Sequence, residues 1–230
     1  FINIEVRHLD IEEEGRIKAI YTDGEVYRAR SVIFAMGAKH RLLGIPGEKE
    51  LTGMGVSYCA TCDGAFFRNK VTAVIGGGDV AVEDAIFLAR MCSKVYLIHR
   101  RNELRAAKSL QENLLSLDNV EVIWDTVADS INGDGMVKSL SLTNVKNGQK
   151  RELDVQGVFI AVGITPESRA FEGLVDMDHG YIRAGEDTVT SAPGIFAAGD
   201  VRTKPLRQII TAAADGANAI TSVERYLVEN

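Results

Sequence analysis

Two cysteines separated by two residues are the strongest chemical signal in this sequence. Cys59 and Cys62 enclose Ala60-Thr61, and Asp63 follows directly. In a reducing compartment such a pair is usually catalytic or metal-binding. A redox dithiol works in two steps, in which one thiolate attacks a substrate disulfide and the second resolves the mixed disulfide. Thiol and thiolate interchange during these steps, so a neighbouring acid/base is needed, and Asp63 is a candidate.

Other interpretations of these residues are less favoured. A zinc site needs two further ligands at suitable spacing, and only Cys92 and four scattered histidines remain. A structural disulfide is disfavoured because three cysteines in 230 residues indicate a reducing compartment. Asp63 can also be a turn residue before Gly64, and Cys92, in an apolar helical segment, is typical of a small core residue. The sequence therefore favours a redox dithiol and predicts no metal site.

A glycine-rich loop supplies a second candidate site. The pattern Gly76-x-Gly78-x-x-Ala81 follows a strand-like run and opens a helical segment. In a dinucleotide fold the first glycine makes the turn, the second lets the backbone approach the pyrophosphate, and the small third residue lets helix and strand pack closely. The helix N-terminus stabilises the negative charge. A glycine run alone is more often a plain turn, but in this context we predict a dinucleotide site at Gly76, Gly78, Asp79 and Ala81.

The residues at the end of the next predicted strand, 95–98, indicate whether NAD or NADP binds. An acidic residue there would hold the ribose 2′-hydroxyl of NAD, whereas this sequence has His99-Arg100-Arg101 and then Arg105. Arginines can surround a 2′-phosphate with charge-assisted hydrogen bonds. A solvated basic helix start is the alternative, but it opposes the helix macrodipole unless an anion offsets the charge. We therefore predict NADPH, bound in part by His99, Arg100, Arg101 and Arg105.

These candidate residues need a βαβαβ unit to position them. The apolar periodicity predicts three strands, at 71–75, 95–98 and 120–124. It predicts two helices, at 79–91 and 103–117. This order is the dinucleotide-binding half-fold.

The chain also contains an internal repeat. An apolar run ending in Ala-x-Gly occurs at 30–37 and again at 156–163, each after a β-meander with turn residues. Only the second copy has the full α/β unit. By symmetry, a matching unit with its own glycine-rich turn is expected before Phe1. A further strand at 194–200 ends in Gly-Asp and precedes a helix at 206–227.

We therefore predict an α/β fold with two dinucleotide-binding, Rossmann-like domains, each with a β-meander. One domain is interrupted and comprises residues 1–40 and 165–230, and the other is inserted and comprises 41–164. A net charge of −6 disfavours a broad basic face for nucleic acid. No apolar run approaches the roughly 20 residues that span a bilayer, and no signal-peptide pattern is present. We expect a cytoplasmic protein that binds neither nucleic acid nor membrane.

Taken in order, these motifs resemble those of bacterial-type, low-molecular-weight thioredoxin reductases. The shared motifs are Cys59-Ala60-Thr61-Cys62-Asp63-Gly64, Gly76-Gly77-Gly78-Asp79, His99-Arg100-Arg101, Gly199-Asp200-Val201 and Arg207-Gln208. The resemblance covers essentially the whole chain. The residues between the cysteines separate it from the related alkyl hydroperoxide reductase flavoproteins. One departure is Ala35-Met36-Gly37, where the family usually has Ala-Thr-Gly, so a thioether replaces a hydroxyl.

The resemblance implies a homodimer in which an FAD domain is interrupted by an NADPH domain that carries the dithiol. Electrons would pass from NADPH to FAD, then to the Cys59–Cys62 disulfide, and finally to thioredoxin. Cys62 would face the flavin, Cys59 would attack thioredoxin, and Asp63 would be the acid/base. Asp200 would hydrogen-bond the ribityl chain, with Arg207, Gln208 and Ile209 along the isoalloxazine ring. Further cofactor contacts would come from Ala35, Gly37, Gly163 and Gly199.

The family also implies a domain rotation, with hinges near 37–43 and 163–167. Two alternatives are kept. In one, this chain is a non-catalytic NADPH-binding fragment, because the expected N-terminal flavin-binding unit is missing from it. In the other, it is a related flavoprotein reductase with a different disulfide acceptor.

Overall fold

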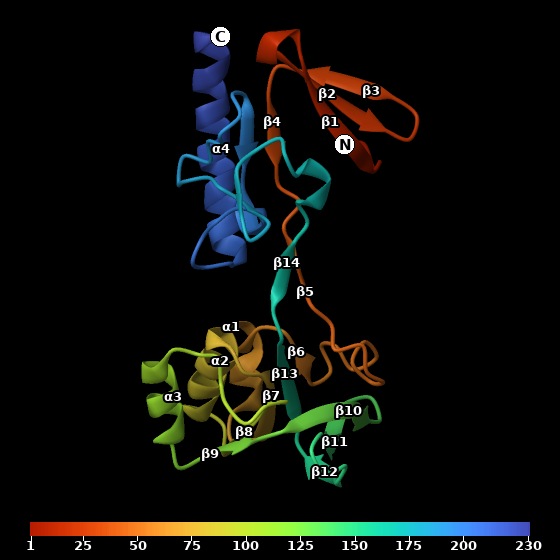
Figure 1. Ribbon diagram of the computed structural model, residues 1–230, viewed down its shortest axis with the longest axis vertical. Coiled ribbons are helices and arrows are strands. Elements are labelled where there is room, and N and C mark those ends of the chain that lie inside the picture. Colours follow the sequence, from red (N-terminus) through yellow and green to blue (C-terminus); the bar gives the residue numbers. More distant parts are fainter. The chain divides into compact units, whose positions relative to one another are not determined.

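The computed structural model describes residues 1–230, which form two compact units (Figure 1). The split unit comprises Phe1–Lys39 and Ile164–Asn230, and the inserted unit comprises His40–Gly163. Each unit contains buried hydrophobic clusters of its own. No helix of the structure combines the length and the apolar character needed to cross a membrane.

The inserted unit is built on a five-stranded parallel sheet of order β6-β13-β7-β8-β9. These strands are β6 (Val56–Ser57), β7 (Val71–Gly76), β8 (Lys94–Ile98), β9 (Val120–Ile123) and β13 (Gly157–Ala161). Parallel strands are covered on both faces, which explains the nearly continuous apolar sequences of β7 and β13. The predicted α/β fold with parallel sheets is confirmed.

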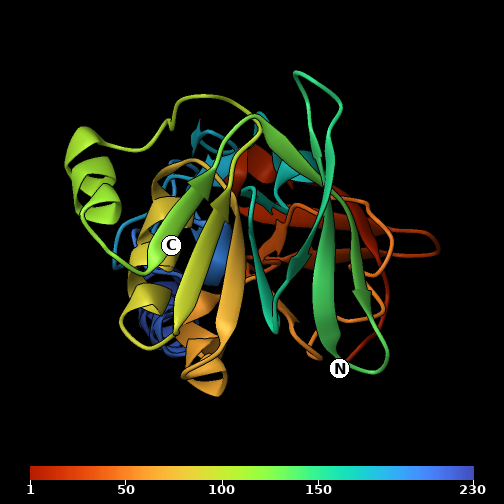
Figure 2. The ribbon, with the colours of Figure 1, turned by 90° about the horizontal axis from the view of Figure 1, so that it is seen from below.

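Successive residues of β7 face opposite layers, as the two-residue period of a strand requires. Val74 packs in a cluster with helices α2 (Asp79–Ala89) and α3 (Lys108–Leu115). Ala73 and Ile75 pack in a second cluster with an antiparallel meander. Figure 2 shows the helices and the meander on opposite sides of the parallel strands. The meander strands are β10 (Thr126–Gly133), β11 (Val137–Asn144) and β12 (Lys150–Asp154).

The predicted start of α3 is wrong. The sequence pattern predicts a helix from 103, but α3 begins at Lys108. The preceding residues bond to the glycine loop instead, because the Arg105 N–H donates to the Gly77 carbonyl (2.7 Å) and the Ala107 N–H donates to Asp79 Oδ1 (2.8 Å). Arg105 therefore precedes α3 and does not occupy its first turn. The arginines therefore do not oppose the dipole of this helix from its first turn, as the sequence pattern had predicted.

The split unit contains an antiparallel meander and a short parallel sheet. The meander strands are β1 (Val6–Glu12), β2 (Ile17–Thr22) and β3 (Val26–Ala29). The parallel pair is β4 (Val32–Phe34) with β17 (Ile195–Ala197). A small hairpin joins β15 (Met177–Asp178) to β16 (Tyr181–Ile182), and β5 (Ala38–His40) pairs with β14 (Ile164–Pro166).

Helix α4 (Ile209–Glu229) ends the split unit. It starts at a capping box, in which the Gln208 side chain and the Thr211 side chain satisfy each other's backbone N–H groups. The helix starts three residues after the predicted one, which spans 206–227. Its first apolar residues are exposed, with Ile209 91% and Ile210 75% accessible.

Candidate active site

A disulfide joins Cys59 and Cys62, whose Cα atoms are 5.3 Å apart. The pair lies at the start of the short helix α1 (Ala60–Asp63), between β6 and the 3₁₀ turn Gly64–Phe67. One helical turn brings residues three apart to the same side, which suits the span of a disulfide. Cys59 is the N-cap, and its Sγ accepts a hydrogen bond from the Cys62 N–H at 3.2 Å.

The Asp63 carboxylate is tied to this pair through Ser57. Ser57 Oγ donates to Asp63 Oδ2 at 2.6 Å, and the Cys59 N–H donates to Ser57 Oγ at 3.0 Å. Ser57 is 5% exposed and ends β6. Ser57 was not predicted from the sequence, where its one signal is its position two residues before Cys59. Ser57 and Asp63 both line a cavity of about 200 Å³ that the exposed Phe66 also borders.

A larger cavity, of about 470 Å³, lies at the carboxyl ends of β7, β8 and β13. Ligands of open α/β sheets bind in this position. Four of the predicted nucleotide-binding residues line it, namely Gly76, His99, Arg100 and Arg105. The other wall comes from the segment that opens the unit, at Arg41, Leu42, Leu43 and Ile45.

Two glycines of the loop, Gly76 and Gly77, leave no room for a side chain, whereas a Cβ on Gly78 would meet no atom within 4 Å. A Cβ on Gly76 would lie 2.5 Å from the Ala161 carbonyl oxygen and 2.6 Å from Ala81 Cβ. Ala81 is fully buried, so its small side chain lets α2 approach the sheet. Gly78 is the N-cap of α2, and Asp79 begins the helix.

The His99 ring packs against this glycine loop. Its Nδ1 lies 2.9 Å from the Gly76 carbonyl oxygen, so Nδ1 carries the hydrogen and donates it. A Cβ on Gly77 would lie 2.2 Å from the His99 ring. Burial lowers the pKa of His99, which favours the neutral ring. Its Nε2 is then an acceptor, and it is buried.

The three arginines near the cavity are available to an anion. Arg100, Arg101 and Arg105 are exposed, and no carboxylate of the chain forms an ion pair with them. Arg100 and Arg105 line the cavity, whereas Arg101 is not part of its wall. A dianionic phosphate at this edge would meet unneutralised positive charge.

Helix α2 also carries a half-buried carboxyl group, Asp84. Burial raises its pKa to about 7, and the neighbouring Glu83 adds to the rise. The folded pKa exceeds the unfolded value, so the contribution of Asp84 to the unfolding free energy is most favourable below about pH 4 and is lost as pH rises through about 7.

We predict that Asp84→Asn removes this pH dependence. At pH 8 the variant should be more stable than the parent by about 1 to 3 kcal/mol, and at pH 4 it should have no advantage. Urea unfolding monitored by Trp124, the single tryptophan and a residue of the inserted unit, measures this. Glu112→Gln, on the exposed face of α3, is the control and should change stability by less than about 0.5 kcal/mol. A parallel pH profile for Asp84→Asn and the parent would contradict the prediction.

In the split unit, the predicted flavin residues gather where β17 meets α4. The 3₁₀ turn Gly199–Val201 follows β17, and Asp200 Oδ1 is buried in it without a partner. Arg207 Nε donates to the Asp200 carbonyl at 3.4 Å, and the guanidinium lies 4.1 Å from the centre of the Tyr181 ring. Gln208 and Ile209 begin α4.

Ala35 follows β4, the strand beside β17, so it lies near Gly199 at the same end of the pair. The Gly37 carbonyl accepts the Glu167 N–H at 3.1 Å in the split unit. Gly163 is the last residue of the inserted unit, and its carbonyl accepts the Arg41 N–H at 2.9 Å.

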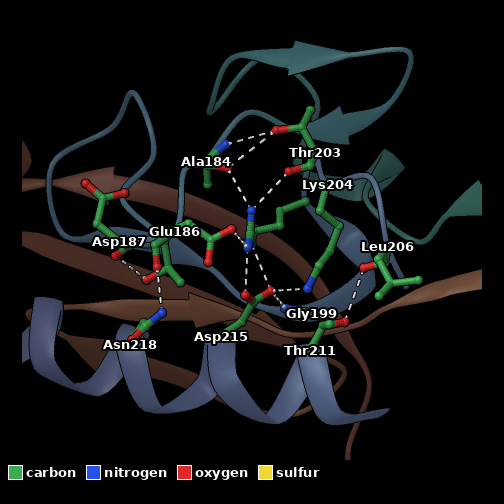
Figure 3. A network of polar contacts seen from close by, with 12 residues as sticks. Ala184, Glu186, Asp187, Gly199, Thr203, Lys204, Leu206, Thr211, Asp215 and Asn218 are labelled. Carbon is green, nitrogen blue, oxygen red and sulfur yellow. Dashed lines mark hydrogen bonds and ion pairs between the residues drawn. The ribbon is translucent and has the colours of Figure 1, made fainter. Parts of the chain in front are cut away.

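A buried polar network fixes this turn to α4 (Figure 3). Asp215 of α4 accepts hydrogen bonds from the Gly199 N–H (2.8 Å), from Lys204 Nζ (2.7 Å) and from both Arg202 Nε (2.8 Å) and Nη2 (2.7 Å). Burial alone would raise the pKa of Asp215, but the bonds from Arg202 and Lys204 outweigh it and lower the pKa to about 2.

Comparison with known proteins identifies the family. Residues 2–216 match the pyridine nucleotide-disulphide oxidoreductase family. Thioredoxin reductase from Peptoclostridium acidaminophilum is 45% identical over 229 residues, which cover 96% of this chain and 73% of that protein. The chain belongs to this family, as a homologue of bacterial thioredoxin reductases. The predicted resemblance is therefore confirmed.

Two further relatives agree with this assignment. Thioredoxin reductase from Listeria innocua is 46% identical over 225 residues, covering 96% of this chain and 70% of that protein. The crystal structure of thioredoxin reductase from Streptococcus pyogenes matches with a TM-score of 0.93 and 45% identity, over 99% of this chain and 74% of that one.

Proposed function

We propose that this chain is an NADPH-dependent disulfide reductase whose Cys59–Cys62 pair reduces the disulfide of thioredoxin. The observation that carries the proposal is the disulfide at the start of α1, with Asp63 tied to it through Ser57. The nucleotide-sized cavity lies on the same parallel sheet. The identity of 45% to a thioredoxin reductase supports thioredoxin as the acceptor.

The reduced dithiol would act in two displacements. The Cys59 thiolate attacks one sulfur of the partner disulfide, which breaks that bond and forms a mixed disulfide. The Cys62 thiol loses its proton, and its thiolate attacks Cys59 Sγ to re-form the Cys59–Cys62 disulfide. Two electrons pass to the partner, which leaves as a dithiol. Asp63 would take the Cys62 proton and return it to the departing thiolate.

NADPH would bind in the cavity of the inserted unit. The pyrophosphate would lie at the N-terminus of α2, against Gly76, Gly78 and the backbone of Asp79, while the buried Ala81 lets the helix approach the sheet. Arg100, Arg101 and Arg105 would hold the 2′-phosphate. His99 already donates its one hydrogen to Gly76, so we assign it to support of the loop.

The split unit fits the FAD that the family implies. Asp200 Oδ1 is a buried acceptor without a partner, as expected where a hydroxylated ligand binds. When bound, FAD supplies the two-electron chemistry that connects the nicotinamide to the disulfide. The residues proposed to hold it are Ala35, Gly37, Gly199, Asp200, Arg207, Gln208 and Ile209, whereas Gly163, the last residue of the inserted unit, is proposed only as a cofactor contact.

The proposal extends to the whole organisation. Residues 1–40 and 165–230 would form the FAD domain, and residues 41–164 the NADPH domain that carries the dithiol. We propose a cytoplasmic homodimer, in line with the resemblance to bacterial thioredoxin reductases.

A coupled assay tests this function. The chain is incubated with FAD, NADPH and oxidised thioredoxin, and the loss of NADPH absorbance is followed. We expect NADPH oxidation that depends on thioredoxin. Glutaredoxin and small disulfides are offered in parallel, and a clear preference for one of them would assign a different acceptor. If NADPH is not oxidised, the chain is reduced with DTT and mixed with oxidised thioredoxin in equal amounts. Failure of this reduced chain to reduce thioredoxin as well would overturn the proposal.

The arginines predict the nucleotide preference. Replacing Arg100, Arg101 and Arg105 together with Ala should weaken NADPH binding by about 10²-fold, because three charge-assisted contacts to the 2′-phosphate are lost. NADH binding should change by less than about twofold, since NADH has no such phosphate. Fluorescence titration of the chain with each nucleotide measures both. Arg90→Ala, at the exposed C-terminal end of α2, is the control. An unchanged preference for NADPH would refute the assignment.

A further inference from the structure

The Ser57 hydroxyl lies at a junction between the dithiol and Asp63. Its oxygen accepts the Cys59 N–H at 3.0 Å, and it donates to Asp63 Oδ2 at 2.6 Å. The Cys59 carbonyl oxygen is a second possible acceptor for the same hydrogen, at 3.3 Å. The shorter distance, to a carboxylate oxygen, shows where the hydrogen points when Asp63 is ionised.

This arrangement serves both protonation states of Asp63. A hydroxyl has one hydrogen to donate and two lone pairs to accept. When Asp63 is ionised, Ser57 donates to it. When Asp63 carries the proton, its O–H can donate to Ser57 Oγ, and the Ser57 hydrogen can turn to the Cys59 carbonyl. Each donor and acceptor remains satisfied in both states, so the carboxyl group need not move when it gains or loses a proton.

The position of Ser57 in the fold makes the junction rigid. Ser57 is 5% exposed, and it ends β6, which pairs with β13 in the parallel sheet. The carboxyl group is thus oriented by the sheet as well as by α1. Because the strand already orders Ser57, its hydrogen bond restricts the Asp63 side chain with little further loss of conformational entropy.

We propose that Ser57 is the positioning residue for the acid–base chemistry of the Cys59–Cys62 pair, holding the Asp63 carboxyl group through its gain and loss of a proton. The inference rests on the proposed function, since it gives Asp63 the proton of the Cys62 thiol. Ser57 itself exchanges no electrons and forms no covalent bond.

The test follows thiol exchange directly, without FAD, NADPH or thioredoxin. The 230-residue chain is reduced with DTT, desalted and mixed with substoichiometric 5,5′-dithiobis(2-nitrobenzoate). The Cys59 thiolate attacks this probe, its S–S bond breaks, and one thionitrobenzoate leaves. The Cys62 thiolate then attacks Cys59 Sγ and releases the second thionitrobenzoate. The rate of this second, unimolecular release is the readout, and an oxidised sample corrects for the buried Cys92.

The expected result is a dependence on Asp63. Asp63→Asn should slow the second release by about 10²-fold, since the group that accepts the proton is lost. Ser57→Ala should slow it by about tenfold. The variant that carries both substitutions should release the second thionitrobenzoate at most about twofold more slowly than Asp63→Asn, because Ser57 acts through Asp63.

Three further variants separate positioning from a general effect on folding. Ser57→Thr keeps the hydroxyl and should retain the parent rate within about threefold, whereas Ser57→Val, of the same shape, should match Ser57→Ala. Ser139→Ala is the matched control, because Ser139 is 6% exposed and donates to a carboxylate oxygen of Glu152 at 2.6 Å on the meander. It should leave the rate unchanged.

Several outcomes would overturn the proposal. They are a parent-like rate for Ser57→Ala, equal losses for Ser57→Thr and Ser57→Val, and multiplicative losses in the double variant. Failure of the proposed function has a different signature. In that case thioredoxin would not be reduced, while the ranking of these variants with the small probe could still be measured.

Discussion

Replacing Cys62 with serine should turn the reduced chain into a trap for its disulfide partner. Cys59 would still attack the partner disulfide, but no second thiolate would resolve the mixed disulfide. We expect a covalent complex with thioredoxin on a non-reducing gel. Turnover in the coupled assay should fall by more than about 10³-fold. The two cysteines act together, so removing either one removes most of their catalytic effect.

The reciprocal variant assigns the roles of the two sulfurs. Cys59→Ser should also lose turnover, and it should form no stable complex with thioredoxin. Cys92→Ala is the control, because Cys92 is buried at 5% exposure and its sulfur donates to the Phe67 carbonyl at 3.4 Å. Trapping by Cys59→Ser and not by Cys62→Ser would reverse the proposed roles. Parent-like turnover in either variant would remove the dithiol from the mechanism.

Local patterns explain why the βαβαβ order could be predicted. Each strand and helix of the inserted unit has its own apolar period and its own flanking turn residues, so β7, β8, β9 and α2 lie within two residues of their expected bounds. The start of α3 could not be predicted in this way. Arg105 gives its N–H to Gly77, 28 residues earlier in the chain, and this distant bond prevails over the local helical pattern.

The same limit applies to the candidate site. Cys59, Cys62 and Asp63 can be found from spacing, because their chemistry requires them to be close in sequence. Ser57 could not, since nothing in a two-residue strand shows that its hydroxyl will face a carboxylate six residues later. Asp215 was also missed, because its partners converge only after α4 packs beside the Gly199–Val201 turn.

Asp215→Asn should destabilise the split unit by about 3 to 5 kcal/mol. Asp215 and Arg202 have side chains only 3% exposed, and removing one partner of a buried ion pair leaves the other charge uncompensated. Lys204, whose side chain is 5% exposed, loses the same acceptor. The loss should appear as faster amide hydrogen exchange across the Gly199–Val201 turn and the adjacent part of α4.

The inserted unit provides an internal reference for this measurement. Trp124 belongs to that unit, so its unfolding in urea should change little in Asp215→Asn. Glu186→Gln is the matched variant, because Glu186 also pairs with Arg202, at 3.4 Å, but its side chain is 87% exposed. Its effect should stay below about 1 kcal/mol, as for exposed pairs in general. Equal amide exchange rates in Asp215→Asn and Glu186→Gln would show that burial of the Asp215–Arg202 pair adds nothing to the stability of the split unit. A strong effect of Asp215→Asn alone would establish that this buried carboxylate, and not the exposed Glu186, maintains the turn that presents Asp200.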